Sequence, residues 1–291
     1  MSESEQKMRV LSFASGSKGN CTLVSLGETH VLVDAGISAT RIERNLRSQG
    51  IAPSELSAIL VTHEHSDHVK GLSVLSKRWG VPVLCSAGTA GFLHTALDAN
   101  TRDCVGTIRA EYDVALGDIT VRAFATPHDT PESFGFRLEG GGEAVAVCTD
   151  LGHVSESVME NLRGVDGIVL EANHDLDMLR YGKYPHFLKL RIRSDLGHLS
   201  NDCAALIALR LAESGTRSFM LAHLSDENNT PRCALETVGL CLEREGLVLG
   251  RDVSLTVAGV ADVRELTLGF QSEVVDALSR SRQEPGCALS D

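Results

Sequence analysis

Four side chains of the types that bind metal ions lie within six consecutive positions. They are His63, His65, Asp67 and His68, in the run HEHSDH at residues 63–68. Neutral imidazole and carboxylate are the ligands that zinc and similar divalent ions bind. A short loop cannot wrap all four side chains around one ion and still leave a position for substrate, so the run favours two adjacent ions. We expect His63 and His65 to project together, and Asp67 and His68 to project elsewhere.

Three further His or Asp residues each come at the end of a predicted strand: His128 after residues 119–126, Asp150 after 144–149, and His223 after 218–222. Catalytic metal sites keep few protein ligands for each ion and leave one position for water. Two such sites need ligands beyond the HEHSDH run, and these strand ends supply candidates. We therefore expect three strands to deliver one ligand each to the same edge of a sheet.

The elements that must position these residues alternate short runs rich in β-branched residues with amphipathic helices. Strands are expected at residues 9–13, 21–26, 30–34, 58–61, 81–85, 119–126, 133–138, 144–149, 167–170, 218–222, 253–257 and 263–268. Helices are expected between Ser38 and Gly50, at 70–78, at 89–97, at 201–213 and from Pro231 onward. No repeat of fixed period and no linker divides the chain. We predict one domain of two similar α/β layers over residues 1–270, followed by a polar tail at 271–291.

The composition is typical of a folded globular protein, with 43% hydrophobic and 23% charged residues in a chain of 291. The 27 Lys and Arg residues against 39 Asp and Glu give a net charge of −12, which argues against nucleic-acid binding over the whole surface. The eight cysteines contain no C-x-x-C pair, so we expect them to be reduced and mostly buried. The chain begins without an apolar signal segment and has no stretch long enough to span a membrane, which predicts a cytoplasmic protein.

One local segment is basic against this acidic background. Residues 180–193 contain no acidic residue and five cations, which are Arg180, Lys183, Lys189, Arg191 and Arg193. Such a segment could bind a phosphate backbone, with an affinity that falls as the salt concentration rises. A solvated surface turn explains the charge equally well. The nearness of the GHLS run at 197–200 favours the binding interpretation.

Residues 15–20, SGSKGN, also have two interpretations. Their glycines could bring backbone N–H groups close to a phosphate. Gly, Ser and Asn commonly form turns, however, and a hairpin turn is the favoured interpretation. The G-x-x-x-x-G-K-[ST] spacing of a nucleotide-binding P-loop is absent.

The order of the candidate ligands resembles that of the metallo-β-lactamase superfamily. An H-x-H-x-D-H run is followed by His128, Asp150 and His223, and the resemblance extends from about Met8 to Leu268. It implies an α/β fold with a four-layer αββα sandwich. It also implies a binuclear site in which a metal-bridging hydroxide is the nucleophile. In that site His63, His65 and His128 bind one ion, Asp67, His68 and His223 bind the other, and Asp150 bridges them.

Two further positions resemble the RNase Z group of that superfamily, in which a Glu and a His act together beside the metal ions. They are Glu171, in the run LEAN, and His198, just before the helix predicted at 201–213. The resemblance implies that His198 assists the leaving oxygen and that Glu171 orients His198. Asp67 is expected to orient the hydroxide as well as to bind metal. The residues expected to contact substrate are Ser200, Lys183, Lys189, Arg191 and Arg193.

Five runs resemble a narrower group, the bacterial YycJ/WalJ proteins: ASGSKGNC at 14–21, THEHSDH at 62–68, EANHD at 171–175, GHLSN at 197–201 and HLSDENN at 223–229. This resemblance implies a 5′-to-3′ exonuclease that acts on double-stranded DNA. Two divalent ions with two ligating carboxylates leave a positive site, which suits an anionic phosphodiester. The short interval between Asp150 and His223 disfavours the branch that carries a large inserted β-CASP domain.

Two other functions remain open. A small-molecule hydrolase, such as a cyclic phosphodiesterase, a thioesterase or a lactonase, would use the same metal ions, and its activity would not depend on Lys189 and Arg191. A noncatalytic partner-binding protein is disfavoured because the ligand set is complete, whereas degenerate members are expected to lose ligands. Zinc and manganese both fit His and Asp ligands, so the sequence predicts two divalent ions without choosing between the metals.

Overall fold

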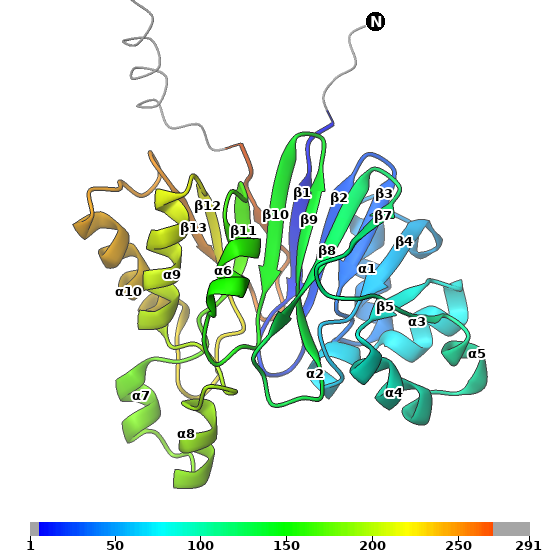
Figure 1. The fold of residues 1–291 in the computed structure, drawn as a ribbon, viewed down its shortest axis with the longest axis horizontal. Coiled ribbons are helices and arrows are strands. Elements are labelled where there is room, and N and C mark those ends of the chain that lie inside the picture. The colour runs from blue at the N-terminus through cyan, green and yellow to red at the C-terminus, as the bar shows by residue number, and fades with distance from the viewer. Residues whose placement is uncertain (1–5, 270–291) are drawn as a thin grey trace, which may run out of the picture.

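The computed structural model describes residues 6–269 and contains two seven-stranded sheets packed against each other. The strand order is β14-β1-β2-β3-β4-β5-β6 in the first sheet and β13-β12-β11-β10-β9-β8-β7 in the second. Helices cover the outer face of each sheet (Figure 1). The predicted αββα sandwich is confirmed.

The elements have the following bounds. The first sheet consists of β1 (Arg9–Ala14), β2 (Cys21–Leu26), β3 (Thr29–Val33), β4 (Leu56–Leu60), β5 (Val83–Cys85), β6 (Val105–Thr107) and β14 (Arg264–Leu266). The second consists of β7 (Asp113–Leu116), β8 (Ile119–Thr126), β9 (Ser133–Gly140), β10 (Glu143–Cys148), β11 (Gly167–Glu171), β12 (Ser218–Ala222) and β13 (Ser254–Val257). The helices are α1 (Ala39–Ser48), α2 (Ser66–Val69), α3 (Leu72–Trp79), α4 (Ala87–Ala96), α5 (Ala99–Arg102), α6 (Glu156–Leu162), α7 (Leu176–Tyr181), α8 (His186–Ile192), α9 (Asn201–Glu213) and α10 (Pro231–Arg244), and a 3₁₀ turn (Pro53–Glu55) precedes β4.

Apolar side chains fill three layers of the sandwich. Val31 of β3 and Phe136 of β9 belong to the layer between the two sheets. Ile42 of α1 belongs to the layer outside the first sheet, and Leu211 of α9 and Val238 of α10 to the layer outside the second. Each sheet is therefore buried on both faces, which explains why central parallel strands such as β12 are almost wholly apolar.

Parallel pairing brings the carboxyl ends of several strands to the same edge. β3 is parallel to β4, and β10, β11 and β12 form a parallel series. β8 is antiparallel to β9, which is antiparallel to β10, so β8 runs in the same direction as β10. The loops that follow these strands therefore meet, and such carboxyl edges are where α/β sheets commonly bind ligands.

Some predicted elements differ from the structure. The helix predicted at 70–78 is α3, which begins two residues later, at Leu72, and the short helix α2 that precedes it was not predicted. Gly71 lies between the two helices, where a Cβ atom would collide with the backbone oxygen of Ile37. The basic segment at 180–193 is not a surface turn, because it contains the end of α7 and all of α8. Six other short elements, β6, β7, α5, α6, α7 and α8, also have no counterpart in the prediction.

The cysteines of the described chain are free, as predicted, but they are not mostly buried. Of these seven, Cys21, Cys85 and Cys148 are buried, three are half-buried and Cys203 is exposed. The reason is that Cys203 and Cys241 lie on the outer helices α9 and α10, which face solvent on one side. None of the helices within residues 6–269 is long and apolar enough to cross a membrane. The predicted boundary at residue 270 and the tail at 271–291 lie outside the described residues.

Candidate metal centre

The HEHSDH run carries the chain from the end of β4 into the short helix α2. His63 and His65 lie in the loop between these elements, and His63 Nε2 is 3.0 Å from His65 Nδ1. His128, in the loop after β8, completes a first group: its ring centroid lies 4.9 Å from that of His63 and 5.3 Å from that of His65. One ligand atom from each of the three residues lies within 4.8 Å of the others, so the group could hold a metal ion.

Asp67, His68 and His223 form a second group beside the first. α2 presents Asp67 and His68, and His223 comes directly after β12. Asp67 Oδ2 lies 3.4 Å from His68 Nε2 and 3.6 Å from His223 Nε2. Ligand atoms of these three residues also lie within 4.8 Å of one another. The four side chains of the run thus divide between two groups.

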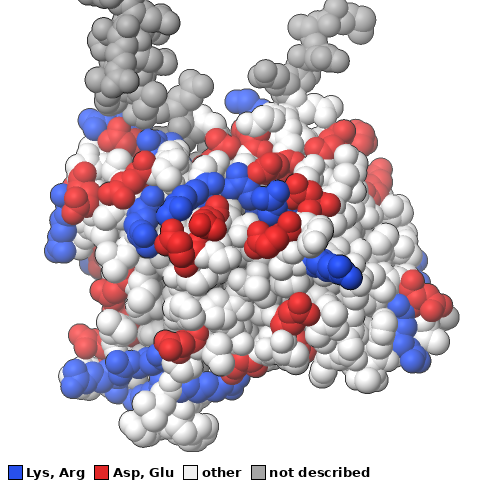
Figure 2. All heavy atoms as spheres, viewed as in Figure 1, with Lys and Arg blue, Asp and Glu red and all other residues white. Residues whose placement is uncertain are grey.

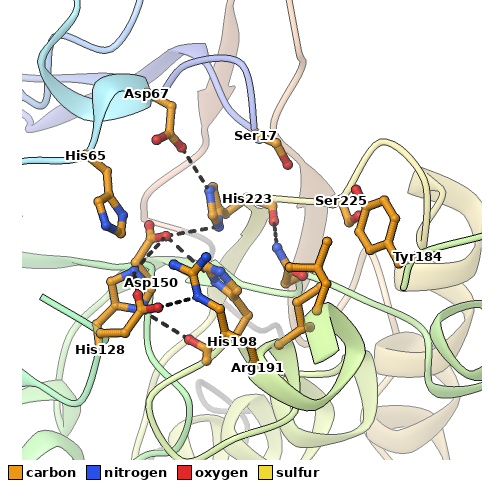
Figure 3. A pocket seen from close by; sticks show the side chains of 15 residues that line it. Ser17, His65, Asp67, His128, Asp150, Tyr184, Arg191, His198, His223 and Ser225 are labelled. Carbon is orange, nitrogen blue, oxygen red and sulfur yellow. Dashed lines mark hydrogen bonds and ion pairs between the residues drawn. The ribbon is translucent and has the colours of Figure 1, made fainter. Parts of the chain in front are cut away.

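Asp150, in the loop after β10, lies between the two groups (Figure 3). Its Oδ2 is 3.3 Å from His68 Nε2, and its Oδ1 is 3.4 Å from His223 Nδ1 and 3.9 Å from His128 Nε2. Three strand ends therefore bring His128, Asp150 and His223 together. Asp150 Oδ2, His128 Nε2 and His223 Nε2 are buried and have no hydrogen-bond partner among the described residues. Since buried polar atoms are normally paired, these three atoms fit a metal-donor set.

Glu171, at the end of β11, is a buried carboxylate that orients two histidines. Its Oε1 accepts hydrogen bonds from His198 Nδ1 at 2.9 Å and from His223 Nδ1 at 2.8 Å, and its Oε2 accepts one from the Leu199 N–H at 2.9 Å. Burial disfavours the charged carboxylate, but the two imidazoles outweigh burial and lower the pKa of Glu171. Because a carboxylate only accepts, both rings donate from Nδ1 and leave Nε2 available for the site.

Asp34, which the sequence did not identify as a site residue, orients His68 in the same way. It follows β3 and is buried. Its Oδ2 accepts a hydrogen bond from His68 Nδ1 at 2.7 Å, and its Oδ1 accepts one from the Thr62 N–H at 2.9 Å. The available signal is the place of Asp34 at the end of a predicted strand, in the same position as Asp150 and His223.

The imidazoles of the two groups have different protonation tendencies. Burial and the neighbouring imidazoles hold the pKa of His63 well below its usual value, and burial lowers that of His128. Burial also opposes charge on His68 and His223, but nearby carboxylates raise the pKa of His68 well above its usual value and that of His223 to about 10. A metal ion replaces such protons when it binds, because neutral imidazole is the ligand form.

The SGSKGN loop at 15–20 is the hairpin turn between β1 and β2, as predicted, and it also contacts the second group. Asn20 Nδ2 lies 3.4 Å from Asp67 Oδ2 and 3.1 Å from His68 Nε2. Ser15 Oγ accepts a hydrogen bond from the His223 N–H at 2.7 Å. The loop therefore supports candidate ligands from two different sheets.

This fold and ligand order can be compared with known proteins. Residues 29–224 match the model of the beta-lactamase superfamily domain. The chain belongs to the metallo-β-lactamase superfamily. The predicted family, and with it the class of hydrolases, is confirmed.

Relatives in this superfamily extend over most of the chain. The chain is 36% identical to exodeoxyribonuclease YycJ of Bacillus anthracis over 242 residues, which cover 81% of this chain and 90% of that protein. It is 34% identical to exodeoxyribonuclease WalJ of Streptococcus pneumoniae serotype 2 over 257 residues, which cover 87% and 94%. The solved structure of the metallo-beta-lactamase fold protein YhfI from Bacillus subtilis has the same fold, with a TM-score of 0.67, 17% identity, and coverage of 89% of this chain and 99% of its own.

The metallo-β-lactamase fold implies divalent metal ions, and the donor set of this chain fits them. The candidate ligands converge from both sheets, and three of their buried atoms have no hydrogen-bond partner among the described residues. A carboxylate that accepts a hydrogen bond from one ring nitrogen of a histidine fixes the tautomer in which the other ring nitrogen can bind a metal ion. Asp34 does so for His68, and Glu171 does so for His223.

A cavity of about 250 Å³ opens at the metal centre. Candidate ligands such as His65 and Asp67 line it, together with His198 and with Tyr184 and Arg191 of the segment that contains α7 and α8 (Figure 3). His198 therefore faces the same space as the ligands, as a residue that assists a leaving group must.

The residues expected to contact substrate have different surroundings. Arg191 lines the cavity and pairs with Asp129 at 2.5 Å. Lys189 Nζ donates to the backbone oxygens of Arg180 and Gly182 and so joins α7 to α8. Lys183 and Arg193 are exposed on the same segment.

The expectation for Ser200 is corrected. Ser200 is buried and is the N-cap of α9, where its Oγ accepts a hydrogen bond from the Cys203 N–H at 3.2 Å. The first turn of a helix leaves N–H groups without a partner, and a serine hydroxyl at this position satisfies one of them. Ser200 therefore begins the helix behind His198 and is not among the residues that line the cavity at the metal centre.

Proposed function

We propose that the chain is a binuclear metal-dependent phosphodiesterase, and specifically a 5′-to-3′ exonuclease that acts on double-stranded DNA. The observation that carries the proposal is the convergence of the His and Asp ligand candidates beside the hydrogen-bonded pair of His198 and Glu171. Relatives named exodeoxyribonucleases, at 36% and 34% identity, support DNA as the substrate.

Two divalent ions, zinc or manganese, are proposed for the site. His63, His65 and His128 would bind one ion, Asp67, His68 and His223 the other, with Asp150 shared between them. Bound ions would stabilise negative charge and lower the pKa of water to make a nucleophile near neutral pH. Two divalent charges against two carboxylates leave the site positive, which favours an anionic phosphodiester.

The chain's own groups have separate roles in this reaction. Burial opposes charge on His198, but Glu171 outweighs burial and raises its pKa, so the ring can carry a second proton on Nε2 and donate it to the leaving oxygen. Asp67, at the cavity, orients the attacking water. The exposed cations at 180–193 bind DNA phosphates, and Lys189 holds the segment that carries them.

The test is hydrolysis of 5′-labelled duplex DNA by the purified chain with manganese or zinc. His65→Ala removes a candidate ligand and is expected to abolish both metal binding and turnover. Nucleotide release that disappears in this variant supports the proposal. Full activity of His65→Ala, or no release of nucleotide by the wild type, contradicts it.

A small-molecule hydrolase on the same metal ions is the second candidate. The cavity volume of about 250 Å³ favours it over a duplex substrate, because this volume is close to the lower end, roughly 300 Å³, of pockets that hold small molecules. A generic bis-aryl phosphodiester, assayed beside the duplex, separates the two candidates. Cleavage of the diester alone, unaffected by loss of Lys189 and Arg191, would select the small-molecule hydrolase.

A further inference from the structure

Helices α7 and α8 form a projection beside the metal centre, which we call the arm (residues 176–193). Figure 1 shows it at the lower left, outside the layers of the sandwich. Three of its large apolar side chains face solvent: Tyr181 is 76% exposed, Phe187 is 73% exposed and Leu190 is 56% exposed. Phe187 and Leu190 are three residues apart on α8 and share a face of that helix. Exposed large apolar side chains concentrated in one region indicate a binding site.

The arm is firmly attached to the sandwich. Leu179 of α7 and Ile192 of α8 are buried and anchor the two helices. Lys189 Nζ donates to the backbone oxygens of Arg180, at 2.9 Å, and of Gly182, at 2.6 Å. The helices that carry the exposed rings are therefore fixed before a partner binds, which reduces the entropy lost on binding.

The arm that carries the exposed rings is basic. The arm has five cations and one acidic residue, Asp177, in a chain of net charge −12. Arg180, Lys183 and Arg193 are exposed and form no ion pair within the described chain. The Arg180 guanidinium lies 5.4 Å from the Tyr181 ring centroid, which is a cation–π distance. In Figure 2, a band of blue side chains at the lower left lies directly above a white projection. This charge favours an anionic partner.

The inner side of the arm is part of the wall of the metal cavity. Tyr184, Leu188 and Arg191 line that cavity. Phe187 precedes Arg191 by four residues in α8, so the two side chains are neighbours on one face of the helix. Phe187 therefore lies next to the cavity wall, on the path of a chain that leaves the cavity along the arm.

The cavity volume favours a single nucleotide over a base-paired end. It is about 250 Å³, below the volume of pockets for typical drug-sized ligands. We therefore expect a terminal nucleotide to leave its base pair before it enters, and unpairing costs free energy. Stacking of the released base on an aromatic side chain offsets that cost.

We propose that the arm is a platform for a single-stranded end of DNA, with Tyr181 and Phe187 stacked on unpaired bases and Arg180, Lys183 and Arg193 on phosphates. The proposal rests on the nuclease function proposed above and specifies its substrate as an unpaired end or a duplex end that the arm helps to open. Self-association through the arm is disfavoured, because a symmetric contact would bring two sets of five cations together. Stacking accepts any base, so we expect binding without sequence preference.

The test is binding of a fluorescein-labelled phosphorothioate oligothymidylate of about ten nucleotides, a length within the usual site sizes. Binding is measured by fluorescence anisotropy on the full chain with its metal ions. The double variant Tyr181→Ala/Phe187→Ala is expected to raise Kd at least about tenfold, which corresponds to about 1.4 kcal/mol. Phe187→Trp should bind as the wild type does. Phe187→Leu, which keeps apolar area without a ring, should bind more weakly.

Phe92→Ala and Tyr112→Ala are matched controls, because these rings are 48% and 64% exposed but lie outside the arm. They should leave Kd unchanged. An unchanged Kd in the double variant, or tight binding by Phe187→Leu, would overturn the platform while wild-type nucleotide release still supports the nuclease. A wild-type chain that releases no nucleotide refutes the nuclease separately. A double variant that loses a dimer in sedimentation, with Kd unchanged, would assign the arm to self-association and also overturn the platform.

Discussion

Replacement of Asp34 by Asn tests whether the metal centre depends on the orientation of His68. Asp34 accepts one hydrogen bond from the Thr62 N–H at 2.9 Å and one from His68 Nδ1 at 2.7 Å. Asn has one acceptor oxygen and a donor amide. If the Asn oxygen keeps the hydrogen bond from the Thr62 N–H, the Asn amide group faces His68 Nδ1. That nitrogen must then accept a hydrogen bond, so the ring proton moves to Nε2. If the Asn side chain is rotated so that its oxygen faces His68, its amide N–H and the Thr62 backbone N–H are two donors that face each other.

The opposed donors disfavour the second arrangement, and the first weakens metal binding by His68. A ring that carries its proton on Nε2 must lose that proton before Nε2 can bind a metal ion. Loss of such an orienting partner typically weakens metal affinity by roughly 10–100-fold, which is about 1.4–2.7 kcal/mol. We expect Asp34→Asn to raise the metal Kd by this factor in competition with a chromophoric chelator. The melting temperature of the metal-loaded protein should fall as well, because bound metal stabilises the folded state.

Glu43→Gln is the matched control for this variant. Glu43 of α1 is also a buried carboxylate with two donors, Arg78 Nη1 at 2.6 Å and Trp79 Nε1 at 3.0 Å, but these lie in α3 on the outer layer. Its loss should lower the free energy of unfolding and leave the metal Kd unchanged. Equal weakening of metal binding in both variants, or no weakening in Asp34→Asn, would refute the reasoning about His68.

Three further results are expected. His198→Ala should keep its metal content, measured by mass spectrometry. Its kcat on DNA should fall by roughly 10²–10⁴-fold, which is the range of general acid catalysis. Loss of metal together with activity would contradict this role. Arg193→Ala and Lys183→Ala should each reduce the slope of log Kd for DNA against log salt by about 0.7–0.9, and an unchanged slope would place that residue outside the interface. Burial raises the pKa of the Cys85 thiol to about 12, so iodoacetamide at about pH 8 should label exposed Cys203 in the native protein and spare Cys85. Equal rates of labelling would contradict this order.

The sequence predicts elements well where a cap and a long apolar pattern agree. The helix predicted at 201–213 has those bounds in the structure, because Ser200 caps it and apolar side chains recur on one face from Ala204 to Ala212. β6 and β7 were not predicted, because these edge strands have only three and four residues and are half exposed. So few positions do not show an alternating pattern. The helices of the arm were not predicted either, because α7 and α8 have only six and seven residues and are separated by Pro185.

The candidate site shows a similar division. The ligand candidates are recognisable because metal-binding residue types recur after predicted strands. The supporting contacts are not, because they join distant parts of the chain: Asp34 reaches His68 across 34 positions, and the Ser15 hydroxyl reaches the His223 backbone across 208. The first pair depends on which strands are neighbours in one sheet, and the second depends on how the two sheets face each other. Periodicity within one segment carries no information about either.

Three residues that shape the metal centre share an uncommon backbone conformation. Asp34, Asp150 and His223 have φ values of 63°, 59° and 55°, and each comes just after a strand. The left-handed region costs a residue with a side chain roughly 1–2 kcal/mol, although Asp and His enter it more readily than most. Glycine would relieve the strain, but it would also remove a ligand or the carboxylate that orients one. The contacts of Asp34 with His68 and of His223 with Glu171 offset the strain. A search for Asp or His directly after a buried strand, where glycine would be easiest, would therefore have found Asp34, which the ligand pattern alone misses.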